Sequence, residues 1–283
     1  MSDLKSILFL FALSVISCSN ETYEEEDMDI SNPDSPVNYV PNTLSDYWVY
    51  DVERSSVDTP EMNFAGSDSL YIVTSIGNSF TYEVNNGLTA LGTMNTLLIN
   101  GSLSKTTTTL NFTGSLDLPI DLPITEMPTI DALKLIDLEA SNGEILSSVS
   151  NSFSETLDIQ GTILPIEISY DLATTKENFY PTNILNGMTY SNVYEATLKL
   201  NIAVTGTITV FGTSQTINII QPQDVLSIRY FYGGDIGLLR AESTQGFELS
   251  SEIISLIQQL GETDMTVSSN TVGVEELTDY LVN

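Results

Sequence analysis

"FTYEVNNG", residues 80 to 87, alternates apolar and polar side chains and then changes direction. Phe80, Tyr82 and Val84 stand at every second position, which is the period of a β-strand that buries one face. The Asn-Asn-Gly that follows is typical of a tight turn, because asparagine and glycine tolerate positive φ. This stretch predicts a strand and a turn of an antiparallel sheet.

Similar short runs, rich in Thr, Ile, Val, Tyr and Leu, continue from residue 40 onward. Three of them place apolar residues at positions one, three and seven around a glycine: LNFTGSL (110–116), LDIQGTI (157–163) and IAVTGTI (202–208). A glycine inside a strand often marks a bulge or a bend. The pattern therefore predicts an all-β fold, either an antiparallel, strongly curved sheet or a two-layer sandwich.

Two further turns are predicted. Ser141-Asn142-Gly143 lies between apolar runs and indicates a hairpin, and YFYGGDIGLLRAES (230–243) reads as a strand, a glycine-rich turn and a strand. The second segment lacks the glycine spacing and the lysine of a phosphate-binding loop, so it gives no support for nucleotide binding.

Helix is expected only near the C-terminus. SSEIISLIQQLGE (250–262) has an apolar face, a serine at its start and a glycine at its end, which together predict a short helix. Val274, Leu277 and Leu281 suggest a second, terminal helix. One or two short C-terminal helices should therefore accompany the sheet.

The N-terminus carries a second signal. After Lys5 comes ILFLFALSVI (7–16), a run too short to span a bilayer but suited to the apolar region of a signal peptide. It ends in Val-Ile-Ser-Cys18, which resembles the lipobox of bacterial lipoproteins. The resemblance implies that residues 1–17 are a signal peptide and that Cys18, the only cysteine, carries a lipid anchor.

The segment after the cysteine is acidic and contains prolines, so we expect residues 18–40 to be an extended, solvated tether. Its acidic cluster is Glu24, Glu25, Glu26 and Asp27. A cluster at this place resembles the surface-export signal of Bacteroidota lipoproteins. The resemblance implies an address on the outer face of the outer membrane. Residues 41–283 should then form a single β-rich domain.

Composition excludes several functions. With 38 acidic and 8 basic residues the net charge is −30, so nucleic acid and anionic lipid surfaces are poor partners. The absence of histidine excludes Ser-His-Asp and Cys-His nucleophile systems and histidine-ligated zinc, haem iron and copper. No cofactor and no metal are therefore expected, and only carboxylates remain for acid–base catalysis.

Three residues are candidate sites. Trp48 and Tyr50 share one face of a predicted strand, where aromatic side chains either fill the core or stack on a ligand such as a sugar. Ser69, in Asp68-Ser69-Leu70, resembles the O-glycosylation site that Bacteroidota use. The YWVYDV run (47–52), taken with residues 230–243, resembles strands of β-rich domains in uncharacterised Bacteroidota lipoproteins, a resemblance that implies no activity.

Three functional hypotheses follow. The favoured one is an outer-membrane-anchored surface lipoprotein with a non-catalytic binding or structural module for a surface glycan or a protein. The alternatives are a carboxylate-dependent, glycosidase-like hydrolase and a carrier of an apolar ligand in a curved sheet. A cleft with two facing acids would favour the hydrolase, a deep apolar groove the carrier, and a closed, filled core the binding module.

Overall fold

The computed structural model describes residues 37–56, 63–116, 129–159, 162–210, 213–260 and 266–283. Strands make up 72% of the described chain, which confirms the all-β prediction. The strands are β1 (Tyr47–Ser56), β2 (Phe64–Ile76), β3 (Ser79–Val84), β4 (Gly101–Lys105), β5 (Thr109–Ser115), β6 (Thr129–Asp137), β7 (Ile145–Ile159), β8 (Thr162–Leu185), β9 (Met188–Val210), β10 (Thr213–Gly233), β11 (Gly237–Glu248) and β12 (Ser268–Leu281). The described helices are α1 (Thr93–Ile99) and α2 (Ser251–Leu260).

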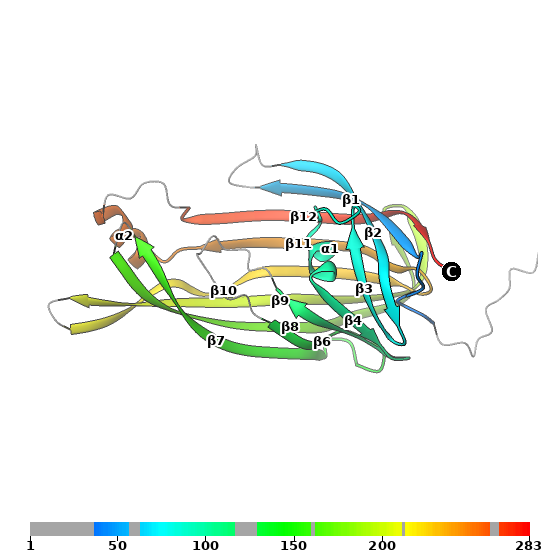
Figure 1. The fold of residues 1–283 in the computed structure, drawn as a ribbon, viewed down its shortest axis with the longest axis horizontal. Helices are drawn as coiled ribbons and strands as arrows, with labels where there is room; N and C mark the ends of the chain where they lie inside the picture. The colour runs from blue at the N-terminus through cyan, green and yellow to red at the C-terminus, as the bar shows by residue number, and fades with distance from the viewer. Residues whose placement is uncertain (1–36, 57–62, 117–128, 160–161, 211–212, 261–265) are drawn as a thin grey trace, which may run out of the picture. The chain divides into compact units, whose positions relative to one another are not determined.

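All of these strands belong to one antiparallel sheet, in the order β6-β5-β4-β3-β2-β1-β12-β11-β10-β9-β8-β7 (Figure 1). The pairing of β1 with β12 joins the two ends of the domain, since Tyr47 lies opposite Leu281. The compact unit spans Val37–Asn283 and so begins slightly before the expected boundary at residue 41.

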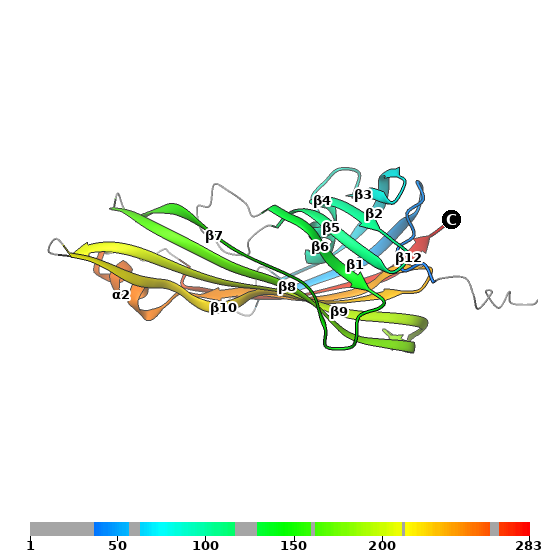
Figure 2. The ribbon, with the colours of Figure 1, turned by 90° about the horizontal axis from the view of Figure 1, so that it is seen from below.

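The sheet curls until it nearly closes on itself, which brings its edge strands β6 and β7 toward each other (Figure 2). The predicted strong curvature is therefore present. A two-layer sandwich is not confirmed, because one hydrogen-bonded ladder runs continuously from β6 to β7. Inward-facing apolar residues of all parts of this ladder form the core.

The strands differ greatly in length. β8, β9 and β10 have 24, 23 and 21 residues, whereas β3, β4 and β5 have 6, 5 and 7. The long strands therefore extend well past the short ones, to the end of the molecule where α2 lies (Figure 1). We call β1–β6, α1 and the segments of the other strands that pack around them the closed half. We call residues 145–172, 200–226 and α2 the long-strand half.

Two helix predictions can be compared with the structure. The helix at 251–260 is confirmed, and its start is capped as expected because Ser250 Oγ accepts a hydrogen bond from Ile253 N at 3.3 Å. The terminal helix is wrong: this segment is β12, with a register shift opposite Val49 and Tyr50. Pairing on both sides, with β1 and β11, outweighs a short helical spacing.

The turn predictions also differ in outcome. Asn85, Asn86 and Gly87 do turn the chain, with φ of 51°, 57° and 82°, and 230–243 is a hairpin as expected. The turn at 141–143 connects β6 to β7, yet these strands are opposite edges of the described sheet and not a hairpin. No helix in the described part of the chain has the length and apolar character needed to cross a membrane.

The mid-strand glycines have more than one role. A register shift between Phe112 and Gly114 gives the predicted bulge, and Gly114 packs against Gly101 so closely that a Cβ would lie 2.7 Å from that Cα. Gly206 continues the β8–β9 ladder without a bulge and makes room for Leu164 and Ile219. Gly161 lies outside the described residues.

Candidate functional site

The closed half has a filled aromatic core. Trp48 and Tyr50 are each 1% exposed, and both use their polar atoms inside the molecule. Trp48 Nε1 donates to Ile236 O at 2.6 Å, and the Tyr50 hydroxyl donates to Leu238 O at 2.9 Å. The two rings are core side chains here, with no exposed face on which a sugar could stack.

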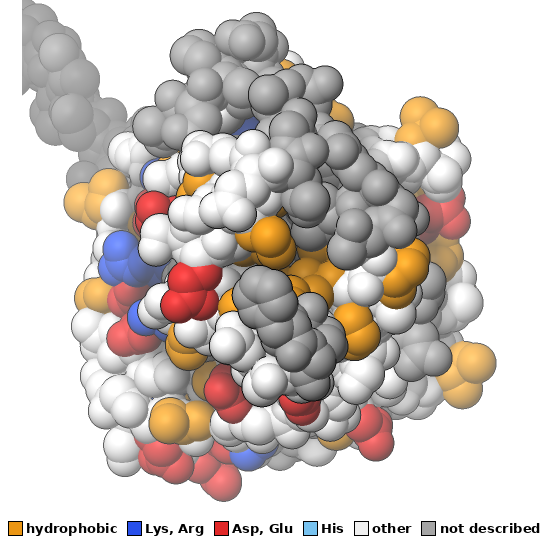
Figure 3. All heavy atoms as spheres, turned by 90° about the vertical axis from the view of Figure 1, so that its left-hand side faces the viewer, with side chains coloured by type: hydrophobic (Ala, Val, Ile, Leu, Met, Phe, Trp, Pro, Cys, Tyr) orange, Lys and Arg blue, Asp and Glu red, His pale blue; other side chains and the backbone are white. Residues whose placement is uncertain are grey.

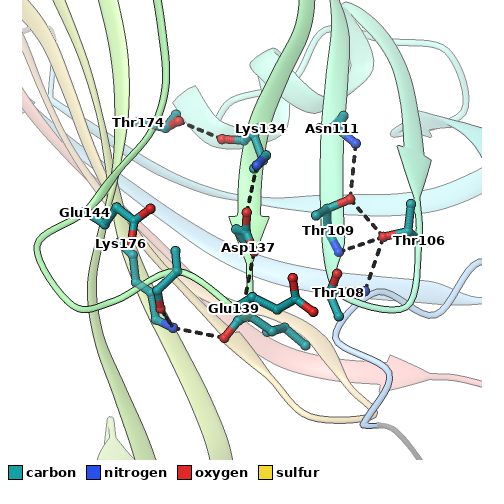
Figure 4. Close-up of polar contacts among 12 residues, drawn as sticks. Thr106, Thr108, Thr109, Asn111, Lys134, Asp137, Glu139, Glu144, Thr174 and Lys176 are labelled. Carbon is teal, nitrogen blue, oxygen red and sulfur yellow. Dashed lines mark hydrogen bonds and ion pairs between the residues drawn. The ribbon is translucent and has the colours of Figure 1, made fainter.

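The gap between β6 and the facing strands is closed by side chains that bond to the β6 backbone and the residues after it (Figure 4). The Thr174 hydroxyl and Lys176 ammonium, both on β8, each donate at 2.6 Å, to Lys134 O and Ala140 O. In two further contacts, Tyr230 OH donates to Leu135 O at 2.7 Å and Asp137 N donates to Tyr194 OH at 3.1 Å. We call these contacts the seam. They satisfy backbone groups at the edge of β6 that have no hydrogen-bond partner on a neighbouring strand.

Two buried carboxylates lie at the start of α1. Asp68 accepts hydrogen bonds from the backbone nitrogens of Leu91 and Gly92, at 3.0 and 2.9 Å. Glu275 accepts from the backbone nitrogens of Met94 and Asn95, at 2.6 and 2.9 Å. Burial raises the pKa of Glu275 to about 7, although the two hydrogen bonds from Met94 and Asn95 act to lower this pKa.

This pair does not resemble the catalytic acids of a hydrolase. Asp68 is 0% and Glu275 2% exposed, and the oxygens of both are occupied by backbone amides. A glycosidase needs two carboxylates that face a substrate cleft. Here the acids fix α1 to the inner face of the sheet. The described residues also contain no cluster of three acidic or sulfur ligands suited to a metal.

The inner face of the long-strand half is apolar and, along most of its length, also buried. On β8, Leu164, Ile166 and Ile168 point inward and are at most 4% exposed, while the neighbouring Ile163 points outward and is 60% exposed. β9 continues this inner face with Ile202 and Val204. The face is completed at its edge by the half-buried Ile208 of β9 and Ile217 of β10, and by Ile253 and Ile257 of α2.

Figure 3 looks onto the end of the molecule where these strands finish. Apolar side chains are visible near the centre of this face, and acidic side chains lie below them. Apolar side chains surrounded by polar ones are typical of a surface that can hold a small apolar ligand.

A cavity of 120 Å³ lies between α1 and the inner face of the long strands. Its walls combine apolar side chains of β10 with polar ones of α1 and β11, and they include a single cation, Arg54. The residues are Arg54, Thr93, Thr96, Leu97, Asn100, Ser115, Leu116, Leu226, Ile228 and Gln245. A shallower groove of 520 Å³ lies at the opposite end, between the β8–β9 hairpin and β12.

The sequence-predicted sites do not gather in one place. Cys18, Glu24, Glu25, Glu26 and Asp27 lie outside the described residues. Ser69 is exposed on the outer face of β2, where a modifying enzyme could reach it, and its O-glycosylation stays a prediction.

Sequence reasoning missed Arg54 and Glu275, because a period-two pattern marks apolar positions and says little about inward-facing charges. The alternation itself was a usable signal for Arg54, which follows Tyr50 and Val52 on the same face.

No protein-family model, curated protein or solved structure matches this chain.

Proposed function

We propose that this chain is a lipid-anchored, non-catalytic surface protein that binds an apolar ligand within its long-strand half. The observation that carries the proposal is the apolar inner face of β8, β9 and β10, which extends beyond the short strands and ends at the half-buried Ile208 and Ile217. Apolar side chains are visible at this end of the molecule (Figure 3). Burying apolar ligand surface there would be favourable by about 25 cal/mol per Å².

The structure of the closed half is consistent with placing the ligand in the long-strand half. Its core is filled by large aromatic side chains, and the seam bonds its edge to the facing strands. Its buried acids are occupied by α1. A filled, closed portion joined to an apolar face is suited to holding a ligand, whereas the described residues of this portion provide no facing acids for hydrolysis.

The anchoring part of the proposal rests on the N-terminal sequence. Cys18 would carry the lipid, and the Glu24–Asp27 cluster would direct the protein to the outer face of the outer membrane. Labelling with a fatty-acid probe should mark the parent and not Cys18→Ala; a labelled Cys18→Ala protein would refute lipidation at this residue.

Ligand binding can be tested with the neutral fluorescent probe N-phenyl-1-naphthylamine. The full chain carrying Cys18→Ala, in detergent-free buffer, serves as the parent. Ile208→Asp and Ile217→Asp each place a charge on the inner face at a half-buried position. Ile163→Asp makes the same chemical change at an exposed position on the outside and is the matched control.

We expect saturable binding by the parent and by Ile163→Asp. Each inner-face variant should bind at least about tenfold more weakly, because an unpaired carboxylate disfavours an apolar neighbour. A parent that shows no saturable binding, or inner and outer variants that bind equally, would contradict the proposed function.

A further inference from the structure

The groove of 520 Å³ between the β8–β9 hairpin and β12 lies at the end of the molecule where the C-terminus lies. Figure 2 shows the hairpin and the C-terminus at this end, far from α2. The walls come from the first residues of β9, from the end of β12 and from the turn between β10 and β11. The groove has the size of a site for a small ligand.

The lining of this groove is polar but uncharged. Five of its nine residues carry a hydroxyl group, namely Thr189, Tyr190, Ser191, Thr278 and Tyr280. None of the nine is charged, although the whole chain has a net charge of −30. The hydroxyls of Thr189 and Ser191 form no hydrogen bond within the described part of the chain. Because a hydroxyl both donates and accepts, this lining suits a ligand that does the same.

Two tyrosines line the groove from different strands. Tyr280 of β12 is 41% exposed, and no other tyrosine in the described ranges is as exposed. Tyr190 of β9 is half-buried, and its hydroxyl makes only a long contact of 3.7 Å with Met188 Sδ. Burial and the neighbouring Tyr280 raise the pKa of Tyr190, so this phenol stays a donor at neutral pH. Each ring offers an apolar face and a polar edge.

The walls of the groove are fixed to the closed half. Trp48 Nε1 donates to Ile236 O at 2.6 Å, and Gly234 N donates to Asn192 O at 3.1 Å, which holds the β10–β11 turn against β9. A side chain at Gly234 is excluded, because its Cβ would lie 2.5 Å from Val37 Cγ1. The groove is therefore preformed, and a ligand would order little of the protein on binding.

Charges near the groove are already paired. Glu276 contributes to the raised pKa of Tyr190, but its Oε1 accepts a hydrogen bond from Arg240 Nη1 at 3.1 Å. An anionic ligand would meet no cation among the lining residues, and a cationic ligand would meet no carboxylate there. The charge distribution therefore favours a neutral ligand.

From these observations we propose that the groove between the β8–β9 hairpin and β12 binds a neutral oligosaccharide. The apolar face of a pyranose ring would pack on Tyr280, while the sugar hydroxyls would exchange hydrogen bonds with Tyr190 and Ser191. This site is separate from the apolar inner face of the long-strand half, and the inference does not rest on the function proposed for that face.

Isothermal titration calorimetry of the Cys18→Ala full chain tests the inference. Maltohexaose, cellohexaose and mannohexaose are the neutral probes, and hexagalacturonate is an acidic probe with the same number of sugar units. Tyr280→Ala removes the exposed ring of the groove. Phe179→Ala removes a ring of β8 that is 40% exposed and lies outside the groove lining, so it is the matched control.

We expect at least one neutral hexasaccharide to bind saturably to the parent and to Phe179→Ala. Tyr280→Ala should bind it about tenfold more weakly, because the ring face is lost. Hexagalacturonate should bind to the parent more weakly than the neutral sugar. Absence of saturable binding by all three neutral probes, unchanged affinity in Tyr280→Ala, or acidic binding as tight as neutral binding would overturn the inference.

Tyr190→Phe provides a second, milder variant that keeps the ring and removes one hydroxyl. It should bind the sugar about threefold more weakly, and an unchanged affinity would overturn the inference even if Tyr280→Ala fails to fold. Neither variant should alter the binding of N-phenyl-1-naphthylamine, so the proposed function is judged separately. Loss of that probe in a folded Tyr280→Ala protein would assign the groove to an apolar ligand and overturn the inference.

Discussion

The closed half and the long-strand half are built from the same ladder, with the same alternation of inward apolar and outward polar residues. They differ in what the inner face meets. Around Trp48 and Tyr230 the facing strands are close enough for the core to fill and for the seam to form. Beyond the ends of the short strands, the described residues provide no strand of equal length to face β8, β9 and β10. Strand length, more than composition, thus distinguishes the two halves, and the proposed binding surface is the end of the longer one.

The largest expected difference concerns large-to-small substitutions. Trp48→Ala removes a fully buried ring and should lower the free energy of unfolding by about 3–5 kcal/mol. Ile208→Ala, at a half-buried position of the long-strand half, should lower it by only about 1 kcal/mol. Urea unfolding of both variants measures this, and equal losses would remove the distinction between the halves.

The free energy of unfolding should depend on pH because of Glu275, a buried acid of the closed half. The pKa of Glu275 is raised from 4.5 to about 7, so the folded protein holds this proton to a higher pH than the unfolded chain. The stabilisation is therefore complete below about pH 4.5 and is lost as pH rises to about 7, a change of about 3 kcal/mol.

Urea unfolding across this range, for the parent and Glu275→Gln, tests the effect. The stability of the parent relative to Glu275→Gln should fall as pH rises. Glu248→Gln, at an exposed position at the end of β11, is the control and should leave the profile of the parent unchanged. A stability difference between the parent and Glu275→Gln that is constant with pH would contradict the prediction.

A smaller effect is expected at the seam. Tyr230→Phe deletes the donor to Leu135 O and leaves a buried carbonyl unpaired, which should cost about 1–2 kcal/mol of unfolding free energy. Tyr71→Phe removes a hydroxyl that donates to Glu83 on the outside of the sheet, and it should cost much less. Similar losses for the two would show that the seam does not stabilise the closed half.

The smallest effect should come from the acidic cluster. Replacing Glu24, Glu25, Glu26 and Asp27 with alanine should leave the free energy of unfolding unchanged, because the compact unit begins at Val37. If the cluster is an export signal, the same change should keep lipidation and abolish protease shaving on intact cells. Equal shaving of the two versions would refute the export hypothesis.

Much of the fold is predictable because it is local. Alternation identified the strands, Asn85–Gly87 and the glycines at 233–237 identified turns, and Ser250 with its apolar face identified α2. α1 was missed although Met94, Leu97 and Leu98 follow helical spacing, since seven residues give a weak pattern.

The remaining features depend on pairing between distant segments. The turn at 141–143 resembles a hairpin, but β6 and β7 pair with other strands, so local sequence could not reveal that it joins two sheet edges. Val274, Leu277 and Leu281 follow a helical spacing that the pairing of β12 with two neighbours overrides. Arg54 meets α1 and β10 only after the sheet has curled.

The most direct test of the central claim is hydrogen–deuterium exchange of the Cys18→Ala full chain with and without saturating N-phenyl-1-naphthylamine. The account predicts new protection at 203–210, 213–220 and 251–260, the ends of β9 and β10 and the helix α2. The segments 47–56 and 79–84 of the closed half should exchange at the same rate in both states, because their core is already filled. Protection confined to the closed half, with none in the long-strand half, would contradict it.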